Sequence, residues 1–204
     1  DAATLTLGDG VRVSVPGDAP FGALYLRVYR FETGLGSGMR KVGPAFRLWP
    51  EEMPIDTDIT VQLPADETLS GKVHVYRHAG RYWSRQSTQR SGSMATLRID
   101  DLGTYQLMED TTAPSIGGFS PPDGYRAQTR RPIIHATMTD GGSGLEDYDV
   151  YLSGQWLLCA FDPDNNRLTW ERDEDLPSGT HTLVFRARDA AGNTARAERT
   201  VVIP

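Results

Sequence analysis

Apolar and polar residues alternate along most of this chain, and turn residues interrupt the alternation roughly every 8 to 12 residues. In residues 11–15 (Val-Arg-Val-Ser-Val), for example, the three valines share one face of a strand because successive side chains point to opposite faces. Helical periodicity is almost absent. This pattern is typical of an all-β sandwich or barrel and argues against a helical fold.

The alternation predicts seven strands in each half of the chain. In the first half they cover residues 11–15, 23–31, 59–63, 72–76, 81–83, 96–99 and 104–107. In the second half they cover residues 115–119, 132–139, 148–152, 156–161, 167–171, 181–188 and 195–202. Seven strands in about 95 residues are typical of an immunoglobulin-like sandwich. We expect its core to contain Val150, Leu152, Leu158, Trp170, Leu183 and Phe185.

A domain boundary is predicted at Glu109–Pro114, where an acidic, Thr- and Pro-containing segment separates two series of strands. The length of 204 residues suits two domains of ordinary size. We therefore predict two tandem β-sandwich domains, residues 1–109 and 110–204, of which the second is immunoglobulin-like. Because the chain begins at Asp1 rather than Met, we expect it to be a mature or excised fragment.

The charge balance excludes some classes of partner. The net charge is −6, with 12 basic and 13 acidic residues in 1–109 and 9 basic and 14 acidic residues in 110–204. A nucleic-acid-binding protein needs a basic face, so we expect no nucleic-acid partner. No apolar run approaches the ~20 residues of a membrane span. The basic residues are 19 Arg and 2 Lys, which indicates a GC-rich bacterial genome.

The side chains that could perform catalysis do not form a known arrangement. His74 and His78 share a strand face but lie about 13 Å apart, too far to bind one zinc ion. The Gly-rich segment 33–38 lacks the Gly-Lys-Ser/Thr of a phosphate-binding loop, and a Gly-x-Ser-x-Gly motif is absent. Cys159 has apolar neighbours, which predicts a buried, inert thiol in the middle of a strand. We therefore predict that these residues form no enzyme active site.

One candidate metal site remains. In an immunoglobulin-like sandwich, the loops that follow the second and sixth strands lie at the end where the chain enters, which would bring together Asp110, Asp140, Asp189 and Asn193. Calcium binds six to eight oxygens, so these side chains are candidate calcium ligands. Alternatively, Asp189 and Asn193 only brace a tight turn by hydrogen bonds to the backbone. The acidic turn Asp162-x-Asp164-x-Asn166 is better interpreted as a hairpin.

The second half resembles a known family. Residues 176–183 (Leu-Pro-Ser-Gly-Thr-His-Thr-Leu) and 185–193 (Phe-Arg-Ala-Arg-Asp-Ala-Ala-Gly-Asn) are similar to the last two strands of bacterial immunoglobulin-like repeats. Residues 110–114 and 140–145 also fit this pattern. The resemblance implies a non-catalytic, extracellular or cell-envelope module of the kind found in adhesins, surface proteins and secreted hydrolases. The first half resembles, through residues 42–50, 82–83 and 102–105, the β domain that follows some lysostaphin-type zinc peptidases.

Three functions stay open at this point. The chain is a structural or interaction module, a spacer or an adhesion-type region, of a secreted or cell-surface bacterial protein. Alternatively, it is an accessory C-terminal segment of a larger cell-wall hydrolase such as a zinc peptidase, or a glycan-binding module. The expected partners are other domains of the same polypeptide and a cell-wall or surface glycan or protein. The candidate aromatic side chains for glycan binding are Tyr82, Trp83, Tyr148, Tyr151 and Trp156.

Overall fold

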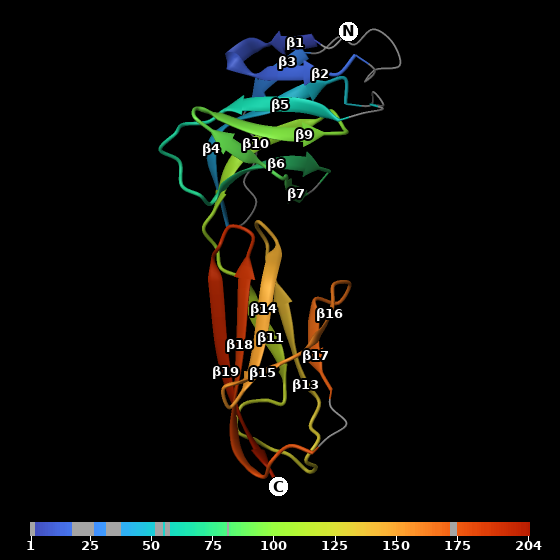
Figure 1. The fold of residues 1–204 in the computed structure, drawn as a ribbon, viewed down its shortest axis with the longest axis vertical. Helices are drawn as coiled ribbons and strands as arrows, with labels where there is room; N and C mark the ends of the chain where they lie inside the picture. The colour runs from blue at the N-terminus through green and yellow to red at the C-terminus, as the bar shows by residue number, and fades with distance from the viewer. Residues whose placement is uncertain are drawn as a thin grey trace. The chain divides into compact units, whose positions relative to one another are not determined.

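The all-β fold class is confirmed by the structure, a computed structural model that describes residues 3–17, 27–31, 38–51, 55, 58–80, 82–171 and 175–204. These residues form strands and one short 3₁₀ turn, η1 (Gly8–Gly10). Their contacts divide into two compact units, residues 1–111 and 112–204 (Figure 1). None of the described segments is a helix with the length and apolar character needed to cross a membrane.

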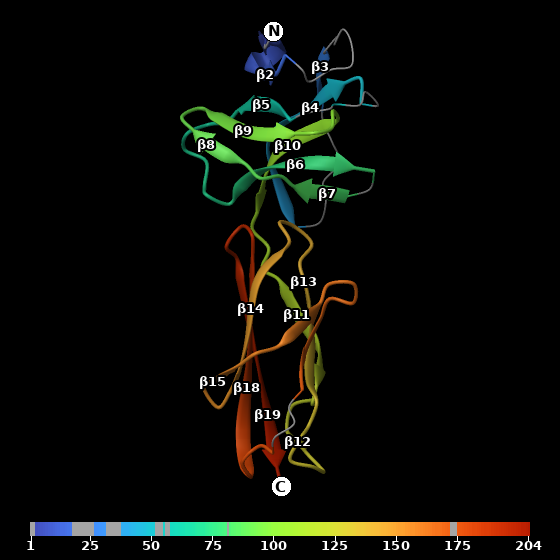
Figure 2. The same ribbon diagram turned by 45° about the vertical axis from the view of Figure 1, so that its right-hand side comes forward.

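The first unit is a sandwich of two antiparallel sheets. One sheet has the strand order β1-β2-β5-β9-β8 and the other has the order β3-β4-β10-β6-β7 (Figures 1 and 2). The strands are β1 (Ala3–Thr6), β2 (Arg12–Val15), β3 (Arg27–Phe31), β4 (Met39–Trp49), β5 (Ile59–Pro64), β6 (Val73–Ala79), β7 (Tyr82–Arg85), β8 (Gln89–Ser91), β9 (Met94–Ile99) and β10 (Thr104–Asp110).

The apolar core of the first unit lies between these two sheets. The alternation read from the sequence sets its composition, since Val11, Val13 and Val15 are buried while Arg12, between the first two valines, is exposed. Val61 of β5 and Leu97 of β9 contribute from the same sheet. The facing sheet supplies the buried side chains Phe46, Leu48, Val73, Val75, Tyr105 and Leu107. Strand β10, at the centre of its sheet, is buried along its whole length.

Three strands of the first unit were not predicted: β1, β4 and β8. The longest of them, β4, runs through Gly43-Pro44, a pair that normally ends a strand. Its pairing with β10 is irregular there, between Gln106 and Met108, so a bulge accommodates the proline within the sheet. Of the strand predicted at 23–31, residues 27–31 form β3. Residues 23–26, most of the Gly-rich segment 33–38, and residue 81 lie outside the described residues.

The second unit has the strand arrangement of an immunoglobulin-like sandwich. Its sheets have the orders β11-β13-β17-β16 and β12-β19-β18-β14-β15 (Figures 1 and 2). In the usual lettering these are A-B-E-D and A′-G-F-C-C′. The strands are β11 (Ser115–Ser120), β12 (Tyr125–Arg126), β13 (Ile134–Thr139), β14 (Leu145–Leu152), β15 (Gln155–Leu157), β16 (Ala160–Asp162), β17 (Arg167–Trp170), β18 (Gly179–Asp189) and β19 (Thr194–Ile203).

Five of the six predicted core residues of the second unit are buried, and Leu158 is not. Its side chain is 77% exposed. The reason is that the single strand predicted at 156–161 is in fact two strands, β15 and β16, which pair with β14 and β17 in opposite sheets. Leu158 and Cys159 form the crossover between the sheets. The prediction that Cys159 lies in the middle of a strand is therefore wrong, and the short strand β12 was also missed.

Candidate functional site

Asp189 ends β18 and holds together the tight loop that leads to β19. Its side chain is fully buried. Oδ1 accepts hydrogen bonds from the backbone N–H groups of Ala191 (2.9 Å) and Asn193 (2.8 Å), and Oδ2 accepts one from Nδ2 of Asn193 (2.8 Å). Gly192, between them, has a φ of 82°, which an L side chain rarely adopts. The hydrogen bonds by which Asp189 and Asn193 were predicted to brace a tight turn are thus present.

Asp140 performs a similar task in the loop after β13. Its Oδ2 accepts hydrogen bonds from the backbone N–H groups of Gly142 (2.9 Å) and Gly144 (2.7 Å). This loop packs on the Asp189 loop, because the N–H of Ala190 donates to the carbonyl of Gly144 and the N–H of Ala191 donates to Oγ of Ser143. As a result, one carboxylate oxygen of Asp140 lies within 4.8 Å of one of Asp189.

Three of the four predicted calcium ligands therefore lie together at one end of the second unit. Two oxygens that each lie about 2.4 Å from a calcium ion are at most about 4.8 Å apart, so the two carboxylates are close enough to share one ion. Thr139 pairs with Ser115, which places Asp140 beside the start of β11, where the chain enters this unit. Asp110 ends β10 of the first unit and is buried. Its role as a ligand stays a prediction.

The second acidic turn forms a hairpin, as the sequence indicated. Asp162 is exposed and accepts hydrogen bonds from the backbone N–H groups of Asp164 and Asn165 and from Nδ2 of Asn165 (2.6 Å). The hydrogen bond from the Asn165 side chain is the main reason why the pKa of Asp162 lies below its usual value. The turn joins β16 to β17, in which Asp162 pairs with Arg167.

The four histidines do not form a metal site in the described part of the chain. His74 and His78 both lie on β6, as predicted, and His78 packs against Trp83 with ring centroids 4.8 Å apart. His135 lies on β13, where burial lowers the pKa of its imidazole. Among the described residues, none of the four histidines belongs to a group of three or more side chains close enough to hold one ion.

The structure adds one serine–histidine contact that the sequence did not suggest. Oγ of Ser153 lies 3.1 Å from Nδ1 of His181, and Nε2 of His181 lies 2.8 Å from the carbonyl oxygen of Pro177. Because a carbonyl only accepts, Nε2 donates there, and in the neutral imidazole Nδ1 then accepts from the Ser153 hydroxyl. Ser153 and Gly154 both have positive φ, as in a two-residue hairpin turn. The serine is exposed and its N–H donates to Thr182, so the contact braces the hairpin.

The aromatic candidates for glycan binding differ in accessibility. Tyr82 is 76% exposed, and Trp83 is half-buried beside the small apolar cluster of Met39, Tyr76 and Met108. Tyr148 points into the sandwich and packs on Phe161, with ring centroids 5.0 Å apart. Trp156 is 52% exposed on the outer face of the second unit. Its Nε1 donates to Oδ1 of Asp149 at 2.7 Å.

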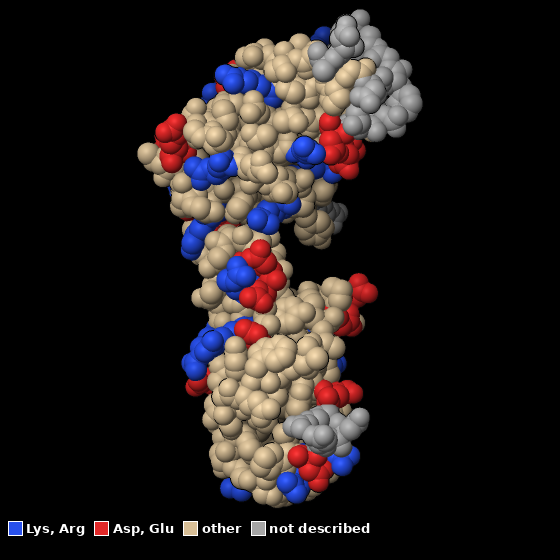
Figure 3. Space-filling view, viewed as in Figure 1, with Lys and Arg blue, Asp and Glu red and all other residues tan. Residues whose placement is uncertain are grey.

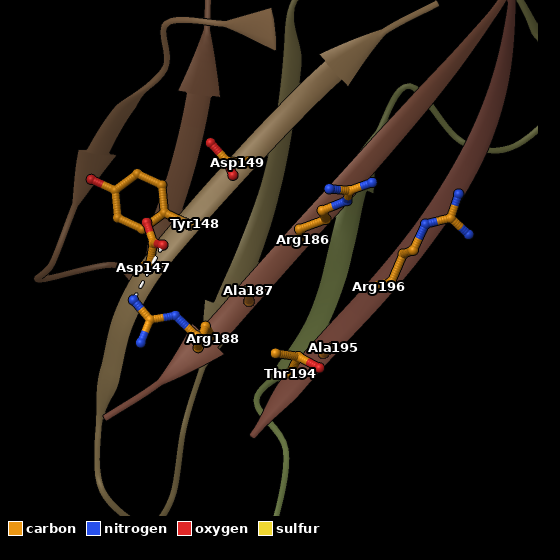
Figure 4. A pocket seen from close by; sticks show the side chains of 9 residues that line it. All are labelled: Asp147, Tyr148, Asp149, Arg186, Ala187, Arg188, Thr194, Ala195 and Arg196. Carbon is orange, nitrogen blue, oxygen red and sulfur yellow. Dashed lines mark hydrogen bonds and ion pairs between the residues drawn. The ribbon is translucent and has the colours of Figure 1, made fainter. Parts of the chain in front are cut away.

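A cavity of about 370 Å³ lies on the outer face of strands β14, β18 and β19 (Figure 4). Its polar side chains are Asp147, Asp149, Arg186, Arg188, Thr194 and Arg196. This site was not predicted from the sequence, because the high arginine content was attributed to a GC-rich genome. The signal was present in Phe185-Arg186-Ala187-Arg188, whose alternation places two arginines on one outward face.

Elsewhere, basic and acidic side chains are interspersed on the face shown in Figure 3, without a continuous basic surface there. Ion pairs between exposed residues contribute to this pattern, for example Arg131 with Asp175 at 2.7 Å and Arg47 with Glu51 at 3.0 Å. Such exposed pairs add at most about 1 kcal/mol to stability. They are therefore features of a solvated surface.

No family model and no curated protein matches this chain. Among solved structures, the chain is similar to one described as "Structures of Clostridium thermocellum CbhA fibronectin(III)-like modules", with 14% sequence identity and a TM-score of 0.37 over 72% of this chain and 85% of that chain.

Proposed function

We propose that the chain is a pair of non-catalytic β-sandwich modules that act as a spacer or interaction region of a secreted or cell-surface bacterial protein. The observation that carries this proposal is that each unit has its own apolar core between two sheets. Several described side chains with catalytic potential are engaged in turns. Asp140, Asp162 and Asp189 brace loops, and the contact of Ser153 with His181 braces a hairpin.

The serine–histidine contact provides the sharpest test of the non-catalytic assignment. A catalytic serine needs preorganised donors for the developing oxyanion, in a site that excludes water, and Ser153 is exposed. We expect no hydrolysis of an activated ester, a peptide or peptidoglycan above the rate given by the same concentration of free imidazole. Hydrolysis that Ser153→Ala abolishes while His74→Ala leaves it unchanged would overturn the proposal.

The alternative of an accessory segment in a cell-wall hydrolase concerns residues outside this chain. It is supported by the resemblance of residues 42–50 and 102–105 to β domains that follow such peptidases. A His- and Asp-containing zinc motif in the reading frame upstream of Asp1 would favour it over a purely structural role. A reading frame made up of further β-sandwich repeats would favour the spacer.

We further propose that Asp140, Asp189 and Asn193, together with Asp110, hold a calcium ion. The separation of less than 4.8 Å between the Asp140 and Asp189 carboxylates supports this proposal. A bound divalent cation would offset the repulsion between the two carboxylates and stabilise the folded chain. Extracellular modules bind calcium with dissociation constants of about 0.1–1 mM, which sets the concentration range of the test.

The test is the melting temperature in calcium, in magnesium and after chelation. We expect a rise with calcium up to about 10 mM that magnesium does not reproduce. Asp140→Asn should abolish the rise. The matched control Asp162→Asn, in the exposed hairpin turn, should keep it. An unchanged melting temperature in calcium would show that the two aspartates serve only their loops.

A further inference from the structure

The cavity on the outer face of the second unit contains a row of charged residues in cross-strand register. We call the outward side chains of Asp147, Asp149, Arg186, Arg188 and Arg196 the arginine face. Asp149 on β14 pairs with Arg186 on β18, which in turn pairs with Arg196 on β19 (Figure 4). The volume of about 370 Å³ lies in the range of small-ligand sites.

Two arginines thus stand directly opposite each other on neighbouring antiparallel strands, an arrangement that destabilises a sheet when their charges are not offset. Arg196 forms an ion pair with Glu198, and Arg188 forms ion pairs with Glu146 at 2.6 Å and Asp147 at 3.4 Å. Arg186 differs from both, since within the described part of the chain no carboxylate forms an ion pair with it. Its positive charge is available to an anion from outside.

The guanidinium of Arg186 is also held in position. Its Cζ lies 5.0 Å from the centroid of the Tyr151 ring. The Tyr151 hydroxyl donates a hydrogen bond to Oδ2 of Asp149 at 3.4 Å, and Nε1 of Trp156 donates one to Oδ1 of the same carboxylate. Asp149 is therefore engaged by two aromatic side chains rather than by the arginine beside it. A guanidinium that contacts an aromatic ring can still direct an N–H edge at a carboxylate and form two parallel hydrogen bonds with it.

We propose that the arginine face binds an acidic saccharide, with a sugar carboxylate between Arg186 and Arg196. The carboxylates of Asp147 and Asp149 on the same face would repel a polyphosphate, but they can accept hydrogen bonds from sugar hydroxyls. The exposed ring of Trp156, bonded to Asp149, offers an apolar surface to a sugar ring. This inference goes beyond the spacer role and does not depend on it.

An acidic peptide is a weaker fit. Extended peptides usually gain affinity by pairing their backbone with a free sheet edge. The backbone of β18 is instead paired on both sides, with β14 and β19, so Arg186 and Arg188 on this strand offer only their side chains. Recognition by side chains alone suits a rigid ring that carries both hydroxyls and a carboxylate. A binding peptide is therefore an outcome that would contradict the proposal.

The test compares an oligogalacturonate with the same oligosaccharide after complete methyl esterification, which removes only the negative charges. The full chain is titrated by calorimetry and by amide chemical shifts at low ionic strength. We expect the acidic form to bind with shifts confined to β14, β18 and β19, and the ester not to bind. Arg186→Gln should weaken binding about tenfold or more, because a charge-assisted bidentate contact is lost.

Two further variants separate the geometry of the Arg186 guanidinium from its positive charge. Arg126→Gln removes the same charge from an exposed arginine on β12 and should leave the affinity unchanged. Arg186→Lys keeps the charge but loses the planar fork, so its affinity should lie below that of the parent chain. The proposal would be overturned if the acidic oligosaccharide and its ester bound equally well, or if the acidic form did not bind at about 10 mM. Unchanged affinity in Arg186→Gln or Arg186→Lys would also contradict it. So would equally tight binding of inorganic sulfate or of a polyglutamate peptide.

Discussion

Asp189 and Asp162 accept the same set of hydrogen bonds in different surroundings. Each accepts two bonds from backbone N–H groups and one from an asparagine side chain. Asp189 is buried, however, while Asp162 is exposed. Water can replace a lost acceptor at the surface but not in the interior, so burial decides the energetic value of otherwise equal contacts.

We therefore predict that Asp189→Ala lowers the free energy of unfolding of the second unit by about 2–4 kcal/mol, because three donors lose their acceptor. Asp162→Ala should have a clearly smaller effect. Urea unfolding of both variants in calcium-free buffer gives the comparison. Equal losses would mean that burial does not control the contribution of these turns.

Cys159 provides a second prediction at the level of a residue. Burial, and secondarily the charge of Asp149, raises the pKa of its thiol to about 11, compared with an ordinary value of 9.0. Between these pH values the unfolded chain binds fewer protons than the folded chain, so stability falls as the pH rises. At pH 8 the thiolate should be about a hundredfold scarcer in the folded chain.

We expect alkylation of Cys159 by iodoacetamide at pH 8 to be slow in the folded chain and fast in urea, as followed by mass spectrometry. A folded chain that reacts as fast as the unfolded one would contradict the predicted shift in the pKa.

At the scale of secondary-structure elements, the crossover from β15 to β16 separates two neighbouring leucines. Leu157 ends β15 and is buried in the core, whereas Leu158 begins the crossover and points into solvent. The local sequence Trp-Leu-Leu-Cys-Ala-Phe is apolar throughout, so it does not reveal where the chain leaves one sheet for the other.

Truncation of these two leucines should therefore give different results. Leu157→Ala should cost about 2–5 kcal/mol through lost apolar contacts and the cavity left behind. Leu158→Ala should remain within about 0.5 kcal/mol of the parent chain. Thermal unfolding monitored by circular dichroism measures both changes. A larger loss of stability for Leu158→Ala than for Leu157→Ala would instead support the single continuous strand that the alternation predicted.

At the scale of the whole molecule, the chain contains two separate apolar cores. One lies between the sheets of residues 1–111 and the other between the sheets of residues 112–204. Among the described residues, each cluster of buried apolar residues draws its members from one unit alone. The domain boundary predicted at 109/110 can be tested through this separation.

We predict that a core substitution in one unit shifts the unfolding of that unit alone. Val61→Ala should lower the melting temperature of residues 1–111. Phe185→Ala should lower the melting temperature of residues 112–204, since it removes about 3–5 kcal/mol from the free energy of unfolding of that unit. Scanning calorimetry of the full chain should resolve two transitions that respond separately. One transition that both substitutions shift equally would show a single cooperative unit.

The sequence by itself determined the fold class, most strands and most core residues. Strand alternation sorts side chains into inward and outward positions locally, as in Val13 and Val15 or in Leu183 and Phe185, and turn residues mark strand ends. These properties depend on neighbours in the chain. For the same reason the hairpin at Asp162 and the loop at Asp189 were recognisable before any tertiary contact was known.

Only the tertiary structure decided which strands became partners and in which register. In the tertiary structure, β4 continues through Gly43-Pro44, and β15 and β16 belong to opposite sheets. The carboxylate of Asp140 lies within 4.8 Å of that of Asp189, and Arg186 pairs with Arg196 on the neighbouring strand. Pairing is selected by burial of residues far apart in the sequence, and a shift of one residue would turn every side chain to the other face. The physical reason is that alternation specifies a face, whereas packing specifies the neighbour on that face.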